Sequence, residues 1–399
     1  MKFKRILKIS SLPFFTSYIE RIDDYHNQLP LKLPYELIYD DNLNLIRCNH
    51  GKIVKDWIKK TYQIGSTGYN VLGKADYMRG EFQKYRINEF TKFFLEKFGD
   101  NLHGLDILEI GCGDGRYLYQ LKKLGANVMG IDPCPFSTFA KNELKIPIKR
   151  QFFDRNAFDK KFDIIYSKNV LEHIKYPIRF LRDCFHLLKK GGFLLSNVPN
   201  CTLQLDIGDP GMMLHEHINY FTKQSLDGIH AIANFRNITI TPSNLKHELY
   251  CIGEKFTDDN ERIYSTIKNQ NEGHGYGKVL LNALNRIQDM FEESNAKTIG
   301  LVGVSHGAIN LLGLLDWKGK SVRLFEKDTN KIGKYITTSE RKIEDEKNLG
   351  KKSVDQIYIM PIFYDNIIRK SLESLGISDN IDIISLKELL IKSKSTLEL

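Results

Sequence analysis

The chain has 399 residues, of which 42% are hydrophobic and 27% charged, an ordinary composition for a folded chain with a substantial core. Only 11 prolines and 6 cysteines are present, which excludes a collagen-like, disordered or disulfide-scaffold protein. At about 150 residues per domain, the length allows two or three domains. The 58 lysines and arginines exceed the 49 acidic residues by a net charge of +9, which raises the question of a nucleic acid or an acidic substrate.

The start of the chain and its longest uncharged stretch bear on targeting. The first eight residues are basic, but no long apolar segment or small-residue cleavage site follows, so we expect no signal peptide. Residues 298–315 lack Asp, Glu, Lys and Arg, yet their glycines and the polar Ser305, His306 and Asn310 favour a strand, a turn and a helix over a membrane span. The cysteines form no C-x-x-C pair, which fits reduced thiols in a cytoplasmic protein.

Strands and helices alternate along the middle of the chain. Residues 87–98 repeat apolar side chains three and four positions apart, which predicts an amphipathic helix. A second helix carries an apolar stripe that begins at Ile178 and is expected to end at Gly191-Gly192. Strands are predicted at 105–110, 127–132, 162–166, 192–198 and 237–241. This alternation predicts an open parallel sheet with helices on both faces.

The composition turns polar past residue 255, and we expect a domain boundary there. A helix with an apolar face is predicted over 279–291. The strand–helix alternation then restarts, with strands at 298–303, 321–325, 356–360 and 381–384. A second α/β domain is the simplest account of this pattern.

A glycine-rich loop follows the first strand of the middle region and precedes a helix. It reads Glu109-Ile-Gly111-Cys-Gly113-Asp-Gly115. Glycines let a backbone approach a ligand closely, and a helix N-terminus favours negative charge. The third glycine comes one residue sooner than in the dinucleotide fingerprint G-x-G-x-x-G. Asp132 ends the next strand about 20 residues on, where a carboxylate accepts hydrogen bonds from ribose hydroxyls.

The loop and Asp132 together resemble the S-adenosylmethionine (SAM) site of class I methyltransferases. The resemblance implies that Asp132 holds the ribose, that Glu109 supports the loop, and that the cofactor is lined by Gly111, Gly113 and Gly115. It also places Asp154 near the adenine and Asn169, in the run Ser167-Lys-Asn169-Val-Leu-Glu-His173, beside the methionine part. The alternative is a tight turn in a Rossmann-like domain that binds no nucleotide.

A second cluster of ionisable groups follows the fifth strand, in the run His215-Glu216-His217-Ile-Asn-Tyr220-Phe221-Thr222. Ligands bind outside the carboxyl ends of strands in an open α/β sheet, so Glu216 or His217 can lie near a methyl donor. Histidine accepts a proton near neutral pH, and a carboxylate beside it increases its basicity. The run is not H-E-x-x-H and no companion ligands are evident, so we expect no metal site. The alternative is a structural cap before a helix that begins after Thr222.

The Glu-His-x-x-Tyr-Phe part of this run resembles the signature of bacterial sugar C-methyltransferases, which act on nucleotide-linked deoxysugars. In that family a keto-sugar loses a proton next to its carbonyl, and the enolate carbon attacks the methyl group. The resemblance implies that His217 is the base, with Glu216 as its orienter or as an alternative base. It further implies that Tyr220 binds the sugar or stabilises an enolate oxygen, and Tyr69 is the match for another tyrosine of the family site.

Other segments resemble the same family in the same order. They are Pro30-Leu-Lys-Leu with Cys48, Met78-Arg79-Gly-Glu-Phe82, Gly303-Val-Ser-His-Gly307-Ala-Ile-Asn-Leu-Leu and Asp328-Thr-Asn-Lys331-Ile-Gly333-Lys334-Tyr335. The chain departs from the family in its N-terminal region, which has Cys48 where the family carries four zinc-binding cysteines, so we expect no structural zinc. The family's Pro-Gly after Tyr335 is also replaced, by Thr337-Thr338-Ser339. These departures leave the sugar and the choice of carbon or oxygen as acceptor open.

The glycine-containing loop at 300–307, between a predicted strand and a helix, allows two interpretations, and so does the net positive charge. His306 and Lys331 either contact the diphosphate or base of a nucleotide sugar or belong to a Rossmann-like domain used only for packing. The lysines and arginines are dispersed, without a basic run interleaved with aromatic residues, so we expect no nucleic-acid partner. A phosphorylated substrate accounts for the positive charge equally well.

We therefore predict an α/β protein with a Rossmann-like class I methyltransferase core and two flanking domains. The expected parts are an N-terminal substrate-side domain without zinc over 1–95, a SAM-dependent methyltransferase domain over 96–255 and a C-terminal Rossmann-like domain over 256–399. The predicted activity is methyl transfer to a sugar or nucleotide-linked sugar, with carbon slightly preferred. The alternatives are a sugar O-methyltransferase of surface glycan biosynthesis and a non-catalytic protein that binds SAM or a nucleotide sugar. The oligomeric state does not follow from the sequence.

Overall fold

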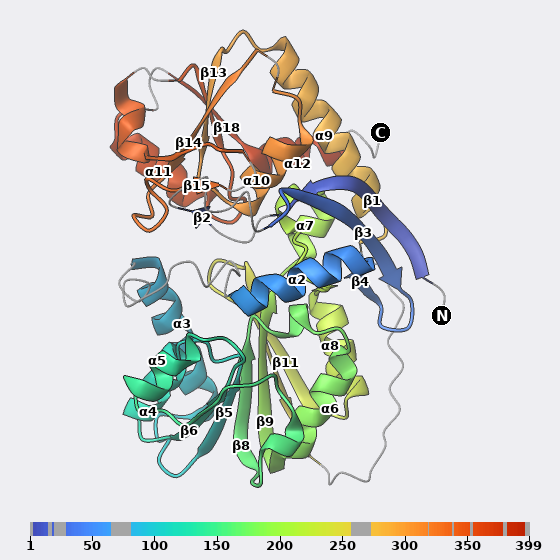
Figure 1. The fold of residues 1–399 in the computed structure, drawn as a ribbon, viewed down its shortest axis with the longest axis vertical. Coiled ribbons are helices and arrows are strands. Elements are labelled where there is room, and N and C mark those ends of the chain that lie inside the picture. Colours follow the sequence, from blue (N-terminus) through green and yellow to red (C-terminus); the bar gives the residue numbers. More distant parts are fainter. Residues whose placement is uncertain are drawn as a thin grey trace.

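The computed structural model of the chain describes residues 3–14, 18–19, 29–64, 81–256, 273–317, 319–336, 339–351, 354–377 and 381–395. Its strands form sheets of four, seven and five strands and one two-stranded pair. Figure 1 shows the seven-stranded sheet at the bottom, the five-stranded sheet at the top and the four-stranded sheet beside their junction. The predicted α/β architecture, with a Rossmann-like core and further sheets around it, is confirmed.

The seven-stranded sheet has the strand order β11-β12-β9-β8-β5-β6-β7. Its strands are β5 (Asp106–Ile110), β6 (Asn127–Ile131), β7 (Ile148–Lys149), β8 (Phe162–Lys168), β9 (Leu188–Pro199), β11 (Arg236–Pro242) and β12 (Glu248–Glu254). The strands from β9 to β7 are parallel to one another, whereas β12 runs antiparallel to both β9 and β11. The carboxyl ends of β5, β6, β8 and β9 therefore meet at one edge, where the loops with the predicted site residues leave the sheet.

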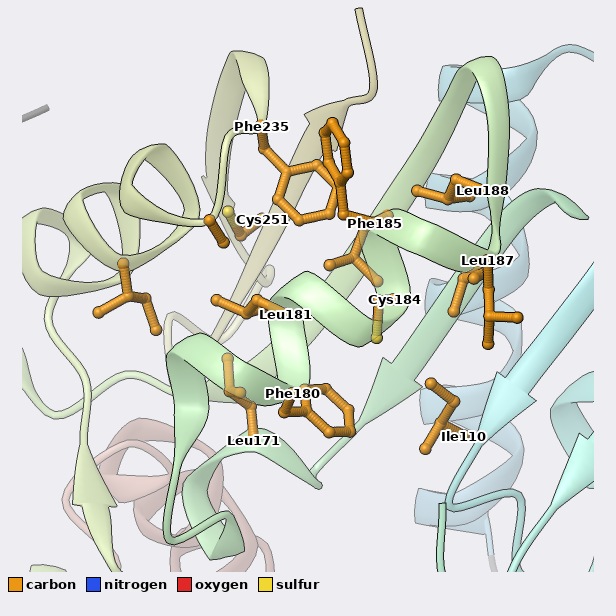
Figure 2. Close-up of a cluster of buried hydrophobic side chains, with 14 of the residues drawn as sticks. Ile110, Leu171, Phe180, Leu181, Cys184, Phe185, Leu187, Leu188, Phe235 and Cys251 are labelled. Atoms are coloured by element: carbon orange, nitrogen blue, oxygen red, sulfur yellow. The ribbon is translucent and has the colours of Figure 1, made fainter. Parts of the chain in front are cut away.

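Helices cover both faces of this sheet and bury its alternating side chains. The helices are α3 (Glu81–Phe98), α4 (Arg116–Lys123), α5 (Ser137–Asn142), α6 (Pro177–Leu187) and α8 (Lys223–Ile232). In β8, Ile165 packs into a core with residues of α6 and α8, while its neighbour Ile164 packs into a second core with residues of α3 and α4. Figure 2 shows the first core, to which α6 contributes Phe180 and Leu181. Two cores on opposite faces follow from the two-residue period of a strand.

The end of α6 differs from the sequence expectation. The helix ends at Leu187 rather than at Gly191-Gly192, which lie within β9. Pairing between β8 and β9 shifts register in this region, and Gly191 has φ 75°. A Cβ atom on Gly192 would lie 2.8 Å from the Asp163 carbonyl oxygen. The two glycines therefore permit a bulge in the sheet instead of a helix cap.

The four-stranded sheet is antiparallel and has the order β1-β3-β4-β10. Its strands are β1 (Phe3–Pro13), β3 (Lys32–Asp40), β4 (Leu45–Cys48) and β10 (Asn219–Tyr220), and the helix α2 (Lys52–Ile64) follows it. The strand β10 comes from the run that contains Glu216 and His217, far away in sequence from the other three strands. The N-terminal sheet thereby fixes the end of the His-Glu-His loop.

The five-stranded sheet is parallel and has the order β16-β14-β13-β17-β18. Its elements are β13 (Thr298–Val302), β14 (Ser321–Glu326), β16 (Ile343–Asp345), β17 (Gln356–Ile359), β18 (Asp382–Ser385), α9 (Tyr276–Glu293), α10 (His306–Leu314), α11 (Asp365–Ser374) and α12 (Leu386–Ser395). A separate pair joins β2 (Tyr18–Ile19) to β15 (Tyr335–Ile336). The uncharged stretch 298–315 is a strand, a turn and a helix, and in the described part of the chain no helix is long and apolar enough to span a bilayer.

One segment, between β9 and β10, contacts all three sheet regions. It contains α7 (Thr202–Ile207) and a short turn η4 (Pro210–Met212). Leu205 of α7 shares a core with Leu37 of β3 and Leu280 of α9. The Asn310 side chain of α10 donates hydrogen bonds to the carbonyls of Pro210 at 2.7 Å and Met213 at 2.9 Å. The segment that leads to His217 is thus held by contacts with elements of both flanking sheets.

We expect Phe180→Ala to lower the free energy of unfolding by about 3–5 kcal/mol, because it leaves a cavity in the core of Figure 2. The matched control is Phe152→Ala, since the Phe152 side chain belongs to the same part of the chain and is 71% exposed. Denaturant unfolding of both variants measures the difference. Equal losses for the two variants would contradict the packing described for α6.

Candidate functional site

The glycine loop joins β5 to α4. Gly111, Gly113 and Gly115 have φ values of 75°, 51° and 75°, a conformation that glycine adopts without strain. A Cβ atom on Gly111 would lie 2.4 Å from Val170 Cγ2, and one on Gly115 would lie 2.6 Å from Ala140 Cβ. A Cβ atom on Gly113 would meet no described atom within 4 Å. The middle of the loop therefore offers its backbone to a ligand at the N-terminus of α4.

Asp132 lies beside this loop at the carboxyl end of β6. Its Oδ2 accepts a hydrogen bond from the Gly113 N–H at 2.8 Å, and its Oδ1 accepts one from the Cys134 N–H at 2.7 Å. Burial raises the pKa of Asp132, and these two backbone N–H groups oppose that rise. Each carboxylate oxygen keeps a lone pair for a ribose hydroxyl. The open loop and the fixed carboxylate thus fit the SAM cofactor that the sequence predicts.

Two further predicted cofactor residues have local partners. Glu109 is buried in β5, and its Oε2 accepts a hydrogen bond from the Tyr166 hydroxyl at 2.8 Å. Burial raises the pKa of Glu109 well above its usual value. Asp154 is exposed and accepts a hydrogen bond from the Asn156 N–H at 2.9 Å. Their expected roles toward the loop and the adenine stay predictions.

Asn169 leaves β8 in the left-handed region, with φ 53°. Its N–H donates to the Asn197 carbonyl at 2.9 Å, and its Oδ1 accepts a hydrogen bond from Arg86 Nη2 at 3.1 Å. Arg86 also contacts the Glu248 carboxylate, to which Lys168 Nζ donates at 2.8 Å. These cations hold the pKa of Glu248 below its usual value. The amide predicted beside the methionine part of SAM is therefore held in place by a buried ion network.

A short turn η3 (Leu171–His173) connects the glycine loop with the His-Glu-His loop. Val170, just before the turn, packs over Gly111. The carbonyl of Glu172 accepts a hydrogen bond from the Ile218 N–H at 2.7 Å, and the ring Nδ1 of His173 hydrogen-bonds the Glu216 carbonyl at 2.8 Å. The expected cofactor loop and the expected base thus lie on two sides of one turn.

Glu172, His173 and His217 come together at this turn. One oxygen or ring nitrogen of each side chain lies within 4.8 Å of the others, the one such group of three found among the described residues. The sequence expectation that His217 lacks companions of the metal-binding type is therefore wrong, whereas the absence of a bound metal stays a prediction. Sequence reasoning missed Glu172 and His173, although they lie within four residues of Asn169, just past the carboxyl end of β8, and this position was the available signal.

Burial sets the ionisation of the His-Glu-His residues. Burial, together with His173 and His306, lowers the pKa of His217 well below 6.5, so its imidazole is neutral at pH 7. Burial alone raises the pKa of Glu216 to about 8. Glu216 Oε1 is buried and has no hydrogen-bond partner in the described part of the chain. Perturbed groups of this kind collect at functional sites.

The two predicted tyrosines have different outcomes. Tyr220 is 1% exposed, and its hydroxyl contacts the Tyr35 hydroxyl and donates to the Leu214 carbonyl at 3.1 Å. Cys48 Sγ lies 3.6 Å from the same hydroxyl. This hydroxyl is therefore engaged in the core of the N-terminal sheet, and its role toward a sugar stays a prediction that the geometry does not favour. Tyr69 lies outside the described residues.

The C-terminal loop 303–306 approaches the site through His306. His306 begins α10 and lies close enough to His217 to affect its pKa. Lys331 Nζ donates to Glu326 Oε2 at 3.0 Å and to the Val304 carbonyl at 3.4 Å, and the Tyr18 hydroxyl donates to the same carbonyl at 2.8 Å. Lys331 is thus committed to packing contacts, while the contact of His306 with substrate stays a prediction.

We expect Glu216→Gln to stabilise the chain relative to the native protein as the pH rises from about 4.5 to 8. A buried carboxyl with a raised pKa holds its proton in the folded state and releases it in the unfolded state, so it lowers stability through this window. The difference in unfolding free energy should grow by up to about 1.4 kcal/mol per pH unit. Denaturant unfolding at pH 5 and pH 8 measures it, and a pH-independent difference would contradict the burial of Glu216.

Comparison with known proteins supports the assignment of the core. A family described as "Methyltransferase domain" matches residues 79–240. A ubiquinone biosynthesis O-methyltransferase of Pelagibacter ubique is 33% identical over 163 residues, which cover 38% of this chain and 68% of that protein. The enzyme of the same name from Proteus mirabilis is 27% identical over 132 residues, 31% of this chain and 54% of its own length. The chain thus spans about half the length of several such relatives.

A solved SAM-dependent methyltransferase from Archaeoglobus fulgidus is also similar, with a TM-score of 0.35 and 18% identity over 42% of this chain and 94% of that one. The glycine loop and Asp132 lie within the segment that the family matches. With a relative one-third identical and covered over 68% of its length, the chain belongs to the SAM-dependent methyltransferases.

Proposed function

We propose that this methyltransferase acts on a sugar or nucleotide-linked sugar that binds at His217. The observation that carries the proposal is the position of Val170 and of the η3 turn that follows it. Val170 contacts the glycine loop, and Glu172 and His173 of the turn contact the His-Glu-His loop. A methyl donor held by the glycine loop and an acceptor held at His217 therefore lie on opposite sides of the η3 turn. Such proximity is what an in-line methyl transfer requires.

SAM supplies a methyl group on a sulfonium, and the chain supplies the alignment and the base. The glycine loop and Asp132 position the cofactor. His217 is neutral at pH 7 and accepts the proton of an acceptor hydroxyl or of a carbon next to a carbonyl. Glu216 is the alternative base, since its raised pKa makes its carboxylate a stronger acceptor of protons once ionised.

Carbon is the acceptor in our first proposal, because the Glu-His-x-x-Tyr-Phe run and the flanking segments resemble sugar C-methyltransferases. Oxygen is a second candidate, favoured by the relatives, whose names describe O-methyltransferases of ubiquinone biosynthesis. Those matches cover 31% and 38% of this chain, so they leave out most of it. Either acceptor uses the same base, since a C–H next to a carbonyl and an O–H both lose a proton.

Transfer of a labelled methyl group into a panel of nucleotide sugars, with and without a keto group, tests the acceptor. We expect label in a sugar, and NMR then places the methyl group on carbon or on oxygen. Phenols are included as a control class because the relatives are O-methyltransferases. Transfer to a phenol without transfer to any sugar would contradict the proposal.

The contribution of Asp132 to SAM binding can be tested separately from the acceptor. Asp132→Ala should raise the dissociation constant for SAM about 10- to 100-fold, because it removes hydrogen bonds to a charged group and releases the Gly113 N–H. Asp159→Ala is the matched control, since Asp159 is exposed. Calorimetry measures both affinities, and an unchanged value for Asp132→Ala would remove this residue from the cofactor site.

A further inference from the structure

Glu172 is a buried carboxyl group without an evident structural reason. It is 1% exposed, and neither of its carboxylate oxygens has a hydrogen-bond partner of normal geometry in the described part of the chain. An unpaired buried carboxyl costs stability. Burial raises the pKa of Glu172 to about 8. A group that is kept at such a cost is more easily explained by chemistry than by packing.

The position of Glu172 relates it to His217 rather than to the core. One of its oxygens lies within 4.8 Å of a ring nitrogen of His217 and of His173, and its Oε1 is 3.9 Å from His173 Nε2. The rings of His173 and His217 meet edge to face, with centroids 4.9 Å apart. Glu216, although adjacent to His217 in sequence, belongs to no such group among the described residues, and only burial shifts its pKa.

A series of polar side chains links Glu172 to a buried ion network. The side chain of Asn169 lies close enough to favour its charged form. The Oδ1 of Asn169 is engaged by Arg86, which orients the amide group. Arg86 is held in turn by Glu248, and Glu248 by Lys168. A buried ion network thus supports Asn169, and Asn169 supports the carboxyl group that faces the histidines.

We propose that Glu172, rather than Glu216, is the carboxylate that orients His217, a positioning role that Asn169 and Arg86 support. The inference rests on the proposed function. The acceptor's proton moves to the His217 imidazole, and the acceptor's electron pair forms the bond to the methyl group. The bond between methyl and sulfur breaks with its pair left on sulfur, which becomes a neutral thioether. Burial raises the pKa of Glu172 to about 8, so its carboxyl group is ionised as the pH passes that value, and the carboxylate then stabilises the imidazolium until the imidazolium releases its proton to solvent.

A double-mutant cycle on the full chain tests this role. At a pH above 8, where the Glu172 carboxyl group is ionised, Glu172→Gln should lower kcat at least tenfold and leave the affinity for SAM within twofold, since the amide keeps the shape but not the charge. The double variant Glu172→Gln/His217→Asn should be no slower than His217→Asn alone, because two residues that act as a unit are not additive. Glu216→Gln should lower kcat further in the His217→Asn background. Glu143→Gln, at an exposed position, is the control for the substitution itself.

A second measurement keeps the inference testable whether or not an acceptor has been found. NMR of ¹⁵N-labelled histidine should show the His217 ring nitrogens shifted by Glu172→Gln and unshifted by Glu216→Gln, with His217→Asn giving the assignment. If the native chain transfers methyl to no sugar but the NMR shift is present, the proposed acceptor is wrong and the Glu172–His217 pair stands. If Glu172→Gln does not fold, Glu172→Asp, which keeps the charge, should retain more activity than Glu172→Ala.

Three results would overturn the inference. They are full kcat in Glu172→Gln, additive losses in the Glu172→Gln/His217→Asn double variant, and loss of native turnover on chelation with recovery on addition of Mn²⁺ or Zn²⁺. The last result would make the same three side chains ligands of a metal ion.

Discussion

The site of this methyltransferase depends on how one segment is held, the chain between β9 and β10. Its end leads into β10, which pairs with β4 of the N-terminal sheet, and its middle accepts hydrogen bonds from the Asn310 side chain of α10. A loop that leaves the carboxyl edge of a sheet is free to take many conformations unless other contacts restrict it. Because contacts on both flanks restrict this one, His217 stands at a fixed place beside the η3 turn.

The buried carboxyl groups of the site differ in how many hydrogen-bond donors surround them. Asp132 and Glu248 are buried and well supplied with hydrogen-bond donors, so their carboxylates are fixed in place. Glu172 and Glu216 are buried with few partners, and burial raises their pKa values to about 8. Carboxylates of the first kind hold neighbouring groups in place, whereas buried carboxyl groups with few partners and raised pKa values collect at functional sites.

Much of the core could be predicted from local patterns. Strands such as 105–110 and 162–166 could be predicted because they are apolar runs, and the Gly111 loop could be predicted from its glycine spacing. The structure confirms the strands and the loop. β12 was missed although it is apolar, since nothing local tells that a chain returns to pair between β9 and β11. The predicted end of α6 was wrong because Gly191 and Gly192 lie in β9. The register between β8 and β9 depends on strand pairing, which a local sequence pattern does not show.

The sequence by itself determined the class of the protein and its cofactor loop, because glycine spacing and an acidic strand end are local features of the chain. Only the tertiary structure decided which side chains meet His217. Glu172 lies more than forty positions earlier in sequence and becomes its neighbour because parallel strands bring their carboxyl ends to one edge. Tyr220, three residues after His217, turns instead into the N-terminal core, because it lies in β10, which pairs with β4 of the N-terminal sheet.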